Sequence, residues 1–249
     1  MNSLIITNFP PLEYSCNEAL NTLSTGLFYC GVDIKTILIT SRYAVEGKSF
    51  VSMNLMRTLA SLNKRVVLLD ADLRRSGIIG RFRIRFQGTG SMGLAQYLAG
   101  MCGIDDILYS TDINNAYMIP IGREVSSSLQ LLSSERMSEL LAWLRRQFDV
   151  ILIDTPPAGV IVDAIEIAKY CDGALIVVSY NRGKKQEIGD LKQNLEKTGC
   201  KVLGAVLNNV DFDSYSNRKY YYKSERYSSY YNDRYYAKNS ASGQRNKRK

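Results

Sequence analysis

The sequence contains no histidine, and its five cysteines are scattered without a Cys-x-x-Cys pair. Because zinc and iron–sulfur sites depend on closely spaced cysteine and histidine ligands, the sequence indicates no site of either kind. It also has no secretory signal pattern, and no apolar run approaches the roughly 20 residues that a membrane helix needs. These absences favour a cytoplasmic protein with reduced cysteines, which would need a partner to bring it to a membrane.

Positive charge is in excess, but it is unevenly distributed. The 249 residues carry a formal net charge of +8, and residues 213–249 hold ten Lys or Arg against three Asp or Glu, a net charge of +7. The remaining residues are almost neutral, and the C-terminal segment matches no recognisable nucleic-acid-binding module. Nucleic acid is therefore an unfavoured partner. A contact of this segment with anionic lipid remains open.

Short aliphatic runs alternate with stretches that have the composition and length of helices. The runs end at Thr40, Asp70, Pro120, Asp154, Tyr180 and Asn208. Helices are predicted over about 16–29, 49–62, 133–148 and 184–198, and residues 77–116 are predicted to form a less regular insertion. Four of the runs are apolar throughout, which is typical of central strands covered on both faces. The predicted fold is α/β, a doubly wound and mainly parallel sheet with helices on both faces.

A candidate phosphate-binding loop follows the first of these runs. The residues after Ser41 read Arg-Tyr-Ala-Val-Glu46-Gly47-Lys48-Ser49, which matches the second half of the pattern G-x-x-x-x-G-K-[ST]. In such a loop, main-chain amides and a helix N-terminus hold phosphates, the lysine offsets their charge, and the hydroxyl binds Mg²⁺. A bare Gly-Lys-Ser is weak evidence, but a strand before it and a helix after it strengthen the interpretation.

Carboxylates end two other predicted strands. Asp70 and Asp72 follow the run 66–69, and Asp154 ends the run 150–153 before Thr-Pro-Pro157. A single aspartate in this position is usually a cap or turn residue. Three of them at the edge where the loop lies predict a site that holds Mg²⁺ and accepts a proton from a nucleophile.

Together, the loop, Asp70-Ala-Asp72-Leu-Arg74-Arg75, Asp154-Thr-Pro-Pro157, Asp163-Ala164 and a C-terminal tyrosine cluster resemble the bacterial tyrosine kinases (BY-kinases) of capsule and exopolysaccharide synthesis. The resemblance covers about residues 14–236. It is greatest to the form in which the kinase is a separate cytosolic chain, activated by the cytoplasmic tail of a transmembrane polysaccharide co-polymerase. It implies the P-loop fold of the ParA and MinD ATPases, ATP and Mg²⁺ as cofactors, and a cognate tyrosine phosphatase as a further partner.

The resemblance also implies roles for individual residues. Lys48 would contact phosphate, Ser49 and Asp72 would bind Mg²⁺, and Asp154 would hold the ion directly or through water. Asp70 would orient or deprotonate the tyrosine hydroxyl, whose pKa near 10 requires assistance as the proton leaves. The implied nucleotide-binding residues are Glu46, Gly47, Lys48, Ser49, Phe50 and Asn208, with Asn208 facing adenine.

The cluster of tyrosines would supply the phosphate acceptors. Nine of the seventeen tyrosines lie among polar residues near the C-terminus, at positions Tyr215, Tyr220, Tyr221, Tyr222, Tyr227, Tyr230, Tyr231, Tyr235 and Tyr236. So few aliphatic residues accompany them that a buried role is disfavoured, and a disordered tail is expected. Each phosphate adds roughly −1.5 to −2 charges, so about four would cancel the charge of the segment. We hypothesise that accumulated phosphates repel the tail from a neighbouring active site.

The chain departs from the loop pattern and from the family pattern in several places. Arg42 stands where the first glycine of the loop pattern is expected, and Phe50 replaces the Ser or Thr that the family usually has after the Mg²⁺ ligand. Ala44-Val45 stands where the family has Pro-Gly, and a β-branched residue at Val45 would be strained if the loop requires positive φ there. In the N-terminal helix, Asn21 and Ser24 stand where a family motif that closes a ring of subunits carries arginines. These departures leave the ring in doubt and leave weak activity as an alternative.

The predicted organisation is an N-terminal helical segment over 1–34 that could contribute to oligomerisation, a kinase domain over 35–212, and a basic tyrosine-rich tail over 213–249. The predicted function is an ATP-dependent protein-tyrosine kinase that phosphorylates its own tail. Two alternatives stay open. One is a ParA- or MinD-like ATPase switch, although Tyr43 occupies the position of their signature lysine. The other is a catalytically weak scaffold.

Overall fold

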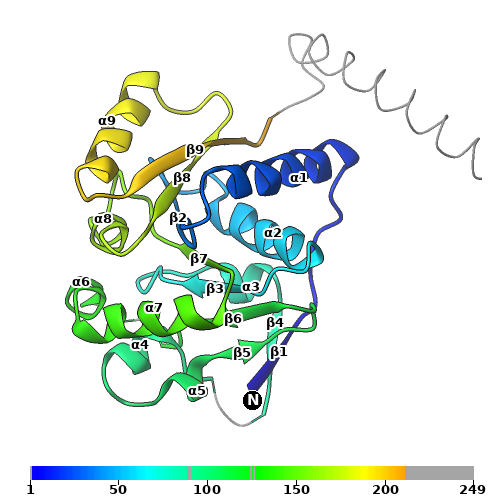
Figure 1. The fold of residues 1–249 in the computed structure, drawn as a ribbon, viewed down its shortest axis with the longest axis vertical. Coiled ribbons are helices and arrows are strands. Elements are labelled where there is room, and N and C mark those ends of the chain that lie inside the picture. The colour runs from blue at the N-terminus through cyan, green and yellow to red at the C-terminus, as the bar shows by residue number, and fades with distance from the viewer. Residues whose placement is uncertain (1, 89–90, 124, 126, 211–249) are drawn as a thin grey trace, which may run out of the picture. The chain divides into compact units, whose positions relative to one another are not determined.

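The computed structural model describes residues 2–88, 91–123, 125 and 127–210, in which strands and helices alternate except between β4 and β7 (Figure 1). The strands in this part of the chain are β1 (Asn2–Ile6), β2 (Thr36–Ser41), β3 (Val66–Asp70), β4 (Ile84–Gln87), β5 (Tyr109–Ser110), β6 (Ala116–Ile119), β7 (Val150–Asp154), β8 (Gly173–Ser179) and β9 (Lys201–Asn208). The helices are α1 (Tyr14–Tyr29), α2 (Lys48–Ser61), α3 (Ile78–Arg81), α4 (Leu94–Leu98), α5 (Ile104–Ile107), α6 (Ser128–Leu132), α7 (Glu135–Gln147), α8 (Asp163–Ala168) and α9 (Lys185–Glu196).

All of these strands join one sheet in the order β4-β1-β5-β6-β3-β7-β2-β8-β9. From β6 to β9 every neighbouring pair is parallel, whereas β1 with β4 and β5 with β6 are antiparallel. The prediction of a mainly parallel sheet is therefore confirmed. The four predicted helices are also present as α1, α2, α7 and α9.

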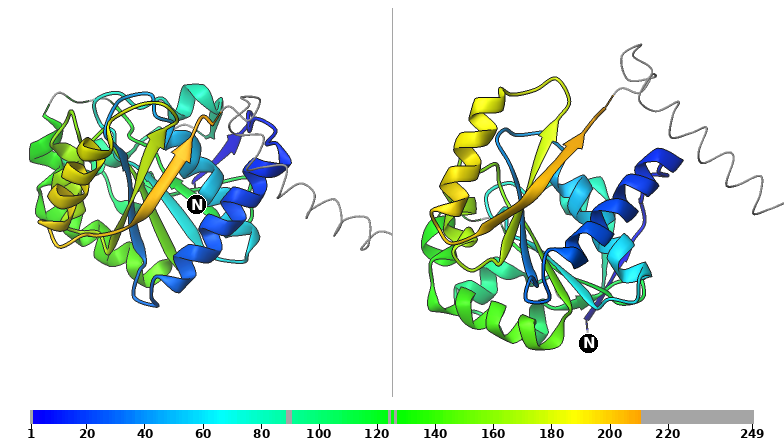
Figure 2. Two further views of the ribbon diagram at one scale, coloured as in Figure 1. Left: turned by 90° about the horizontal axis from the view of Figure 1, so that it is seen from above. Right: turned by 45° about the horizontal axis from the view of Figure 1, so that its top comes forward.

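Apolar side chains of the central strands point alternately to two hydrophobic clusters. In β3, for example, Val67 and Leu69 belong to one cluster and Val66 and Leu68 to the other. Helices α1 to α3 cover the second cluster and α4 to α9 cover the first, so α1 and α9 lie on opposite sides of the strands (Figure 2). Burial on both faces explains why these runs are apolar throughout.

The antiparallel edge of the sheet was not predicted. Strand β1 pairs with β4, with Leu4 opposite Phe86, and the segment expected to be a less regular insertion contributes β4, β5 and several short helices. The N-terminal segment thus adds a strand to the sheet as well as the predicted helix. No helix in the described ranges is both long and apolar enough to cross a bilayer.

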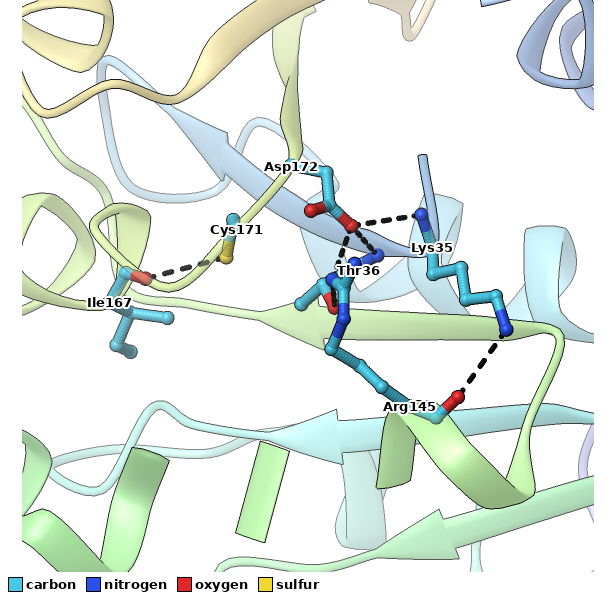
Figure 3. A network of polar contacts seen from close by, with 6 residues as sticks. All are labelled: Lys35, Thr36, Arg145, Ile167, Cys171 and Asp172. Atoms are coloured by element: carbon cyan, nitrogen blue, oxygen red, sulfur yellow. Dashed lines mark hydrogen bonds and ion pairs between the residues drawn. The ribbon is translucent and has the colours of Figure 1, made fainter. Parts of the chain in front are cut away.

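A polar network around Asp172 fastens the amino-terminal ends of β2 and β8 to α7 (Figure 3). One carboxylate oxygen of Asp172 accepts hydrogen bonds from the main-chain amides of Lys35 and Thr36, at 2.9 and 2.7 Å, and from the Arg145 guanidinium. Arg145 also donates to the Thr36 hydroxyl at 2.9 Å. Burial raises the pKa of Asp172, but the hydrogen bonds from Arg145 and the two amides outweigh it, and the net pKa is lowered.

We expect Asp172→Asn to lower the free energy of unfolding at pH 7 by about 1–2 kcal/mol, because the amide loses the charge that strengthens these hydrogen bonds. Since the folded-state pKa is depressed, this contribution is present above the unfolded pKa of about 4 and is lost as the pH falls through the lower folded value. Urea unfolding should therefore show a difference from wild type that shrinks on acidification. Asp33→Asn, which changes an exposed carboxylate nearby, is the control. A difference that did not depend on pH would contradict the assignment.

Candidate nucleotide and phosphoryl-transfer site

The predicted site residues converge because β3, β7 and β2 are adjacent and parallel. Asp70 and Asp154 are register partners at the carboxyl ends of β3 and β7, and Asp154 is also paired with Ile39 of β2. The loop 42–47 leaves β2 at this same edge and leads into α2. In parallel α/β sheets, ligands bind beyond the carboxyl ends of the strands, and this is where the candidate residues lie.

Asp154 is the centre of a hydrogen-bond network with α2. Its carboxylate is 2% exposed and accepts hydrogen bonds from the hydroxyls of Ser49, at 2.7 Å, and Ser52, at 2.9 Å. Burial raises the pKa of Asp154 to about 6, against the opposing influence of Ser49, Lys48 and Ser52. Ser52 was not predicted, although its position one helical turn after Ser49 is a signal that could have found it.

Asp70 is fully buried and only partly satisfied. Ser76, which was also not predicted, donates a hydrogen bond to Oδ2, while Oδ1 has no hydrogen-bond partner among the described residues. Burial and the neighbouring Asp154 charge raise the pKa of Asp70 well above its usual range. Asp72 is less buried, and its pKa is raised mainly by desolvation.

Lys48 is the cation of this cluster. It is 8% exposed, and burial lowers its pKa although Asp154, Asp72 and Glu46 act in the opposite direction. One ammonium group therefore faces three nearby carboxylates in a poorly solvated place. A bound divalent cation would offset this excess of negative charge.

These residues fit Mg²⁺ in a particular way. In the described part of the chain, no group of three or more Cys, Asp or Glu side chains is arranged to hold a metal ion by itself. Mg²⁺ usually binds one or two protein oxygens and completes its octahedron with water and substrate phosphates. The hydroxyl of Ser49 and the carboxylates of Asp154 and Asp72 are the candidate protein ligands.

The side chains of Glu46 and Asn208 hold the phosphate loop through hydrogen bonds. Glu46 is 1% exposed, and its carboxylate accepts hydrogen bonds from the amides of Tyr43, at 2.8 Å, and Ser179, at 3.3 Å. Asn208 donates to the main-chain oxygen of Glu46 at 3.0 Å. Because the Glu46 carboxylate is engaged within the protein, a contact of residue 46 with phosphate would come from its main chain.

Gly47 has two reasons to be glycine. Its φ of +91° lies in the left-handed region, and a Cβ atom there would come within 1.9 Å of Asn208 Nδ2. A side chain at this position would therefore displace the amide that holds the loop. The contact of Asn208 with the loop is a finding of the structure, whereas its contact with adenine remains a prediction.

Phe50 and Asn208 also line an apolar groove between α1, α2 and β9. The groove has a volume of about 310 Å³, and its walls include Leu20, Leu23 and Leu207. Position 50, which carries a hydroxyl residue in the family pattern, thus contributes to an apolar wall beside the loop. The predicted phosphate acceptors, Tyr215 to Tyr236, lie outside the described residues.

Arg74 links the segment after β3 to α8. Its guanidinium forms a two-pronged ion pair with Asp163, with distances of 2.9 and 3.2 Å, and Ser128 donates a third hydrogen bond to this buried carboxylate. The turn that carries Asp72 is thereby fixed to the start of α8. Paired charge-assisted hydrogen bonds of this kind define geometry as well as energy.

Comparison with known proteins agrees with this geometry. The family described as "AAA domain" matches residues 34–202. Tyrosine-protein kinase CpsD of Streptococcus pneumoniae serotype 4 is 34% identical over 194 residues, which cover 78% of this chain and 84% of the relative. The kinase domain of Escherichia coli tyrosine kinase ETK has a TM-score of 0.75 at 28% identity and covers 80% of this chain and 78% of its own. The cell division ATPase MinD of Pyrococcus furiosus has a TM-score of 0.59 at 27% identity, with coverage of 70% and 71%.

The fold and the loop define a P-loop ATPase related to MinD. Within that class, the chain belongs to the bacterial tyrosine-protein kinases of capsule and exopolysaccharide synthesis.

The strain expected at Val45 is present. Val45 has a φ of +63° and is 82% exposed, so a β-branched side chain adopts a left-handed conformation without burial to offset the cost. Strained backbone conformations of this kind are found most often at functional sites, and each costs roughly 1–3 kcal/mol.

We expect Val45→Gly to leave the free energy of unfolding unchanged or to raise it by about 1 kcal/mol, because relief of strain equals or exceeds the entropic cost of glycine. Val32→Gly is the matched control, since Val32 is 91% exposed and lacks a positive φ. It should destabilise by about 0.5–1 kcal/mol. Urea unfolding of both variants measures the contrast, and equal destabilisation would refute strain at residue 45.

Proposed function

We propose that this chain is an ATP- and Mg²⁺-dependent protein-tyrosine kinase that phosphorylates its own C-terminal tyrosines and regulates capsule or exopolysaccharide synthesis and export. One observation carries the proposal. Lys48, Ser49, Asp70 and Asp154 meet at the carboxyl ends of adjacent strands, where they form a cluster with excess buried negative charge. Family membership supplies the substrate class, which the geometry alone does not.

The loop and α2 would hold the nucleotide. Main-chain amides near Gly47 and the amino terminus of α2 would bind the phosphates, and the buried ammonium of Lys48 would offset their charge. Mg²⁺, when bound, would neutralise charge on the transferred phosphoryl group. Ser49, Asp72 and Asp154 are the residues that would hold it, and Ser52 would keep the Asp154 carboxylate oriented.

Asp70 would act on the acceptor. Burial and the Asp154 charge raise the pKa of Asp70 above the usual range of a carboxyl group, so its ionised form is a stronger base than an exposed carboxylate. Lys48 favours the ionised form of the neighbouring carboxylates. Asp70 would orient the tyrosine hydroxyl and take its proton as the tyrosine oxygen bonds to the γ-phosphorus of ATP, while the bond from that phosphorus to the bridging oxygen breaks and ADP leaves. Positioning and charge neutralisation would supply most of the rate.

We also propose that the chain acts at the cytoplasmic face of the membrane, where the cytoplasmic tail of a transmembrane polysaccharide co-polymerase recruits and activates it. A cognate phosphatase would reverse the modification. Exposed Glu18 and Asn21 on α1 leave that helix available for a homo-oligomer, although the arginines of the family's ring motif are lacking.

A weakly catalytic scaffold is the second candidate, and the strained Val45 is the observation in its favour. A scaffold of this kind would bind the membrane partner without efficient phosphoryl transfer. Turnover therefore separates it from the kinase.

We expect Mg-ATP to phosphorylate tyrosines 215–236 of the wild-type chain, more rapidly when a cytoplasmic peptide of the co-polymerase is present. Lys48→Met should reduce the rate at least about 100-fold, because the buried ammonium group that offsets the negative charge of the transferred phosphoryl group is removed. Lys197→Met, at an exposed position after α9, is the matched control and should behave like wild type. Mass spectrometry of the tail reads out the result.

Two outcomes would contradict the proposal. A wild-type chain that binds nucleotide but stays unmodified with and without the peptide would favour the scaffold. Equal modification of wild type and Lys48→Met would show that the loop does not carry the reaction.

A further inference from the structure

Tyr43 connects the phosphate loop to an element outside the site. Its hydroxyl donates a 2.7 Å hydrogen bond to Glu187 Oε1 in the first turn of α9. A Cβ atom added at Gly183 would lie 3.5 Å from the edge of the Tyr43 ring. Glu187 Oε2 also accepts a 2.8 Å hydrogen bond from the Lys184 amide at the start of that helix. One carboxylate thus binds the loop and the helix end together.

The main chain of Tyr43 is fixed as well. Its amide donates to the buried Glu46 carboxylate, and its carbonyl oxygen accepts a 2.6 Å hydrogen bond from Ser41. Contacts therefore run from the loop to the end of β8 through Glu46 and to α9 through Tyr43. The hydrogen bond to Glu187 raises the pKa of Tyr43, and the Lys184 amide and Tyr43 lower the pKa of Glu187, so a phenol donates to a carboxylate at neutral pH.

The loop depends on restraints of this kind because Ala44 and Val45, at its tip, are exposed to solvent and are not held by burial. Val45 is also in the strained left-handed conformation. A strained conformation persists only where the surrounding structure over-determines it. Residues on both sides of Val45 are restrained. Tyr43 is held by Glu187 and Glu46, and the main-chain oxygen of Glu46 accepts a hydrogen bond from Asn208.

We propose that Tyr43 is a positioning residue for the nucleotide phosphates. The hydrogen bond from its hydroxyl to Glu187 holds the loop in the strained conformation that binds them. The inference rests on the proposed nucleotide-binding function. The phosphate-loop pattern by itself does not explain why residue 43 is a tyrosine, and the hydrogen bond to Glu187 of the same chain supplies a reason. Tyr43 touches neither phosphate nor acceptor in this role and acts through the main chain of residues 44–49.

The test is Mg-ADP binding to the full chain, measured by titration calorimetry. Tyr43→Phe keeps the ring and removes the hydroxyl, and it should raise Kd about five- to tenfold. Tyr29→Phe makes the same change at an 85% exposed residue and should leave Kd unchanged. The double variant Tyr43→Phe with Val45→Gly should recover most of the lost affinity, because glycine adopts positive φ without strain.

Recovery by Val45→Gly is the result that a purely structural role of Tyr43 would not produce. A Tyr43→Phe variant with wild-type Kd would overturn the inference, as would a double variant that binds as weakly as Tyr43→Phe. Urea unfolding of each variant shows whether a change in Kd reflects general loss of structure.

Hydrogen exchange without nucleotide separates this inference from the proposed function. Amides of residues 44–49 should exchange faster in Tyr43→Phe than in wild type. If wild type fails to bind Mg-ADP while this acceleration is seen, the proposed function fails, but the restraint of the loop by the Tyr43–Glu187 hydrogen bond is supported. If wild type binds Mg-ADP and neither Kd nor exchange responds to Tyr43→Phe, only the role of this hydrogen bond is refuted.

Discussion

The buried carboxylate of Asp154 is the constraint on which the site depends. It lies at the end of a central strand, accepts hydrogen bonds from Ser49 and Ser52 of α2, and is close enough to Asp70 to raise the pKa of that residue. These contacts fix α2, and with it Lys48, relative to β3 and β7. Carboxylates with so little solvent are tolerated because hydroxyls and one ammonium group surround them. The same arrangement suits a cation and the phosphates of a nucleotide.

The loop above this cluster shows how a departure from a motif is accommodated. Val45 adopts the backbone conformation that glycine would adopt easily, so the shape of the loop is retained at a local cost. Three hydrogen-bonded contacts restrain the loop: Glu46 connects it to β8, Asn208 to β9, and Tyr43 to α9. A sequence change that looks like a loss of function is therefore compatible with an intact site, provided that the restraints outside the motif are present.

Sequence patterns were most informative in the centre of the sheet. The apolar runs 36–40, 66–69 and 150–153 predicted buried strands, and the parallel sheet expected from them placed Asp70, Asp154 and the loop at one edge. The antiparallel edge escaped prediction because β1 and β4 are short and pair across about 80 residues, and only that pairing makes them strands. Ser52 and Ser76 escaped because a serine in or beside a helix is unremarkable until a buried carboxylate lies opposite it.

The sequence by itself determined the α/β class, the phosphate loop, the carboxylates at the strand ends, and the segregation of positive charge and tyrosines near the C-terminus. These features are local, since they depend on periodicity and on short spacings along the chain. Only the tertiary structure decided that Asp154 is held by two serines, that Val45 is strained, and that Tyr43 is bonded to Glu187, 144 residues away. Such contacts join side chains from different elements, and no local pattern specifies which polar groups meet once the sheet and helices have packed.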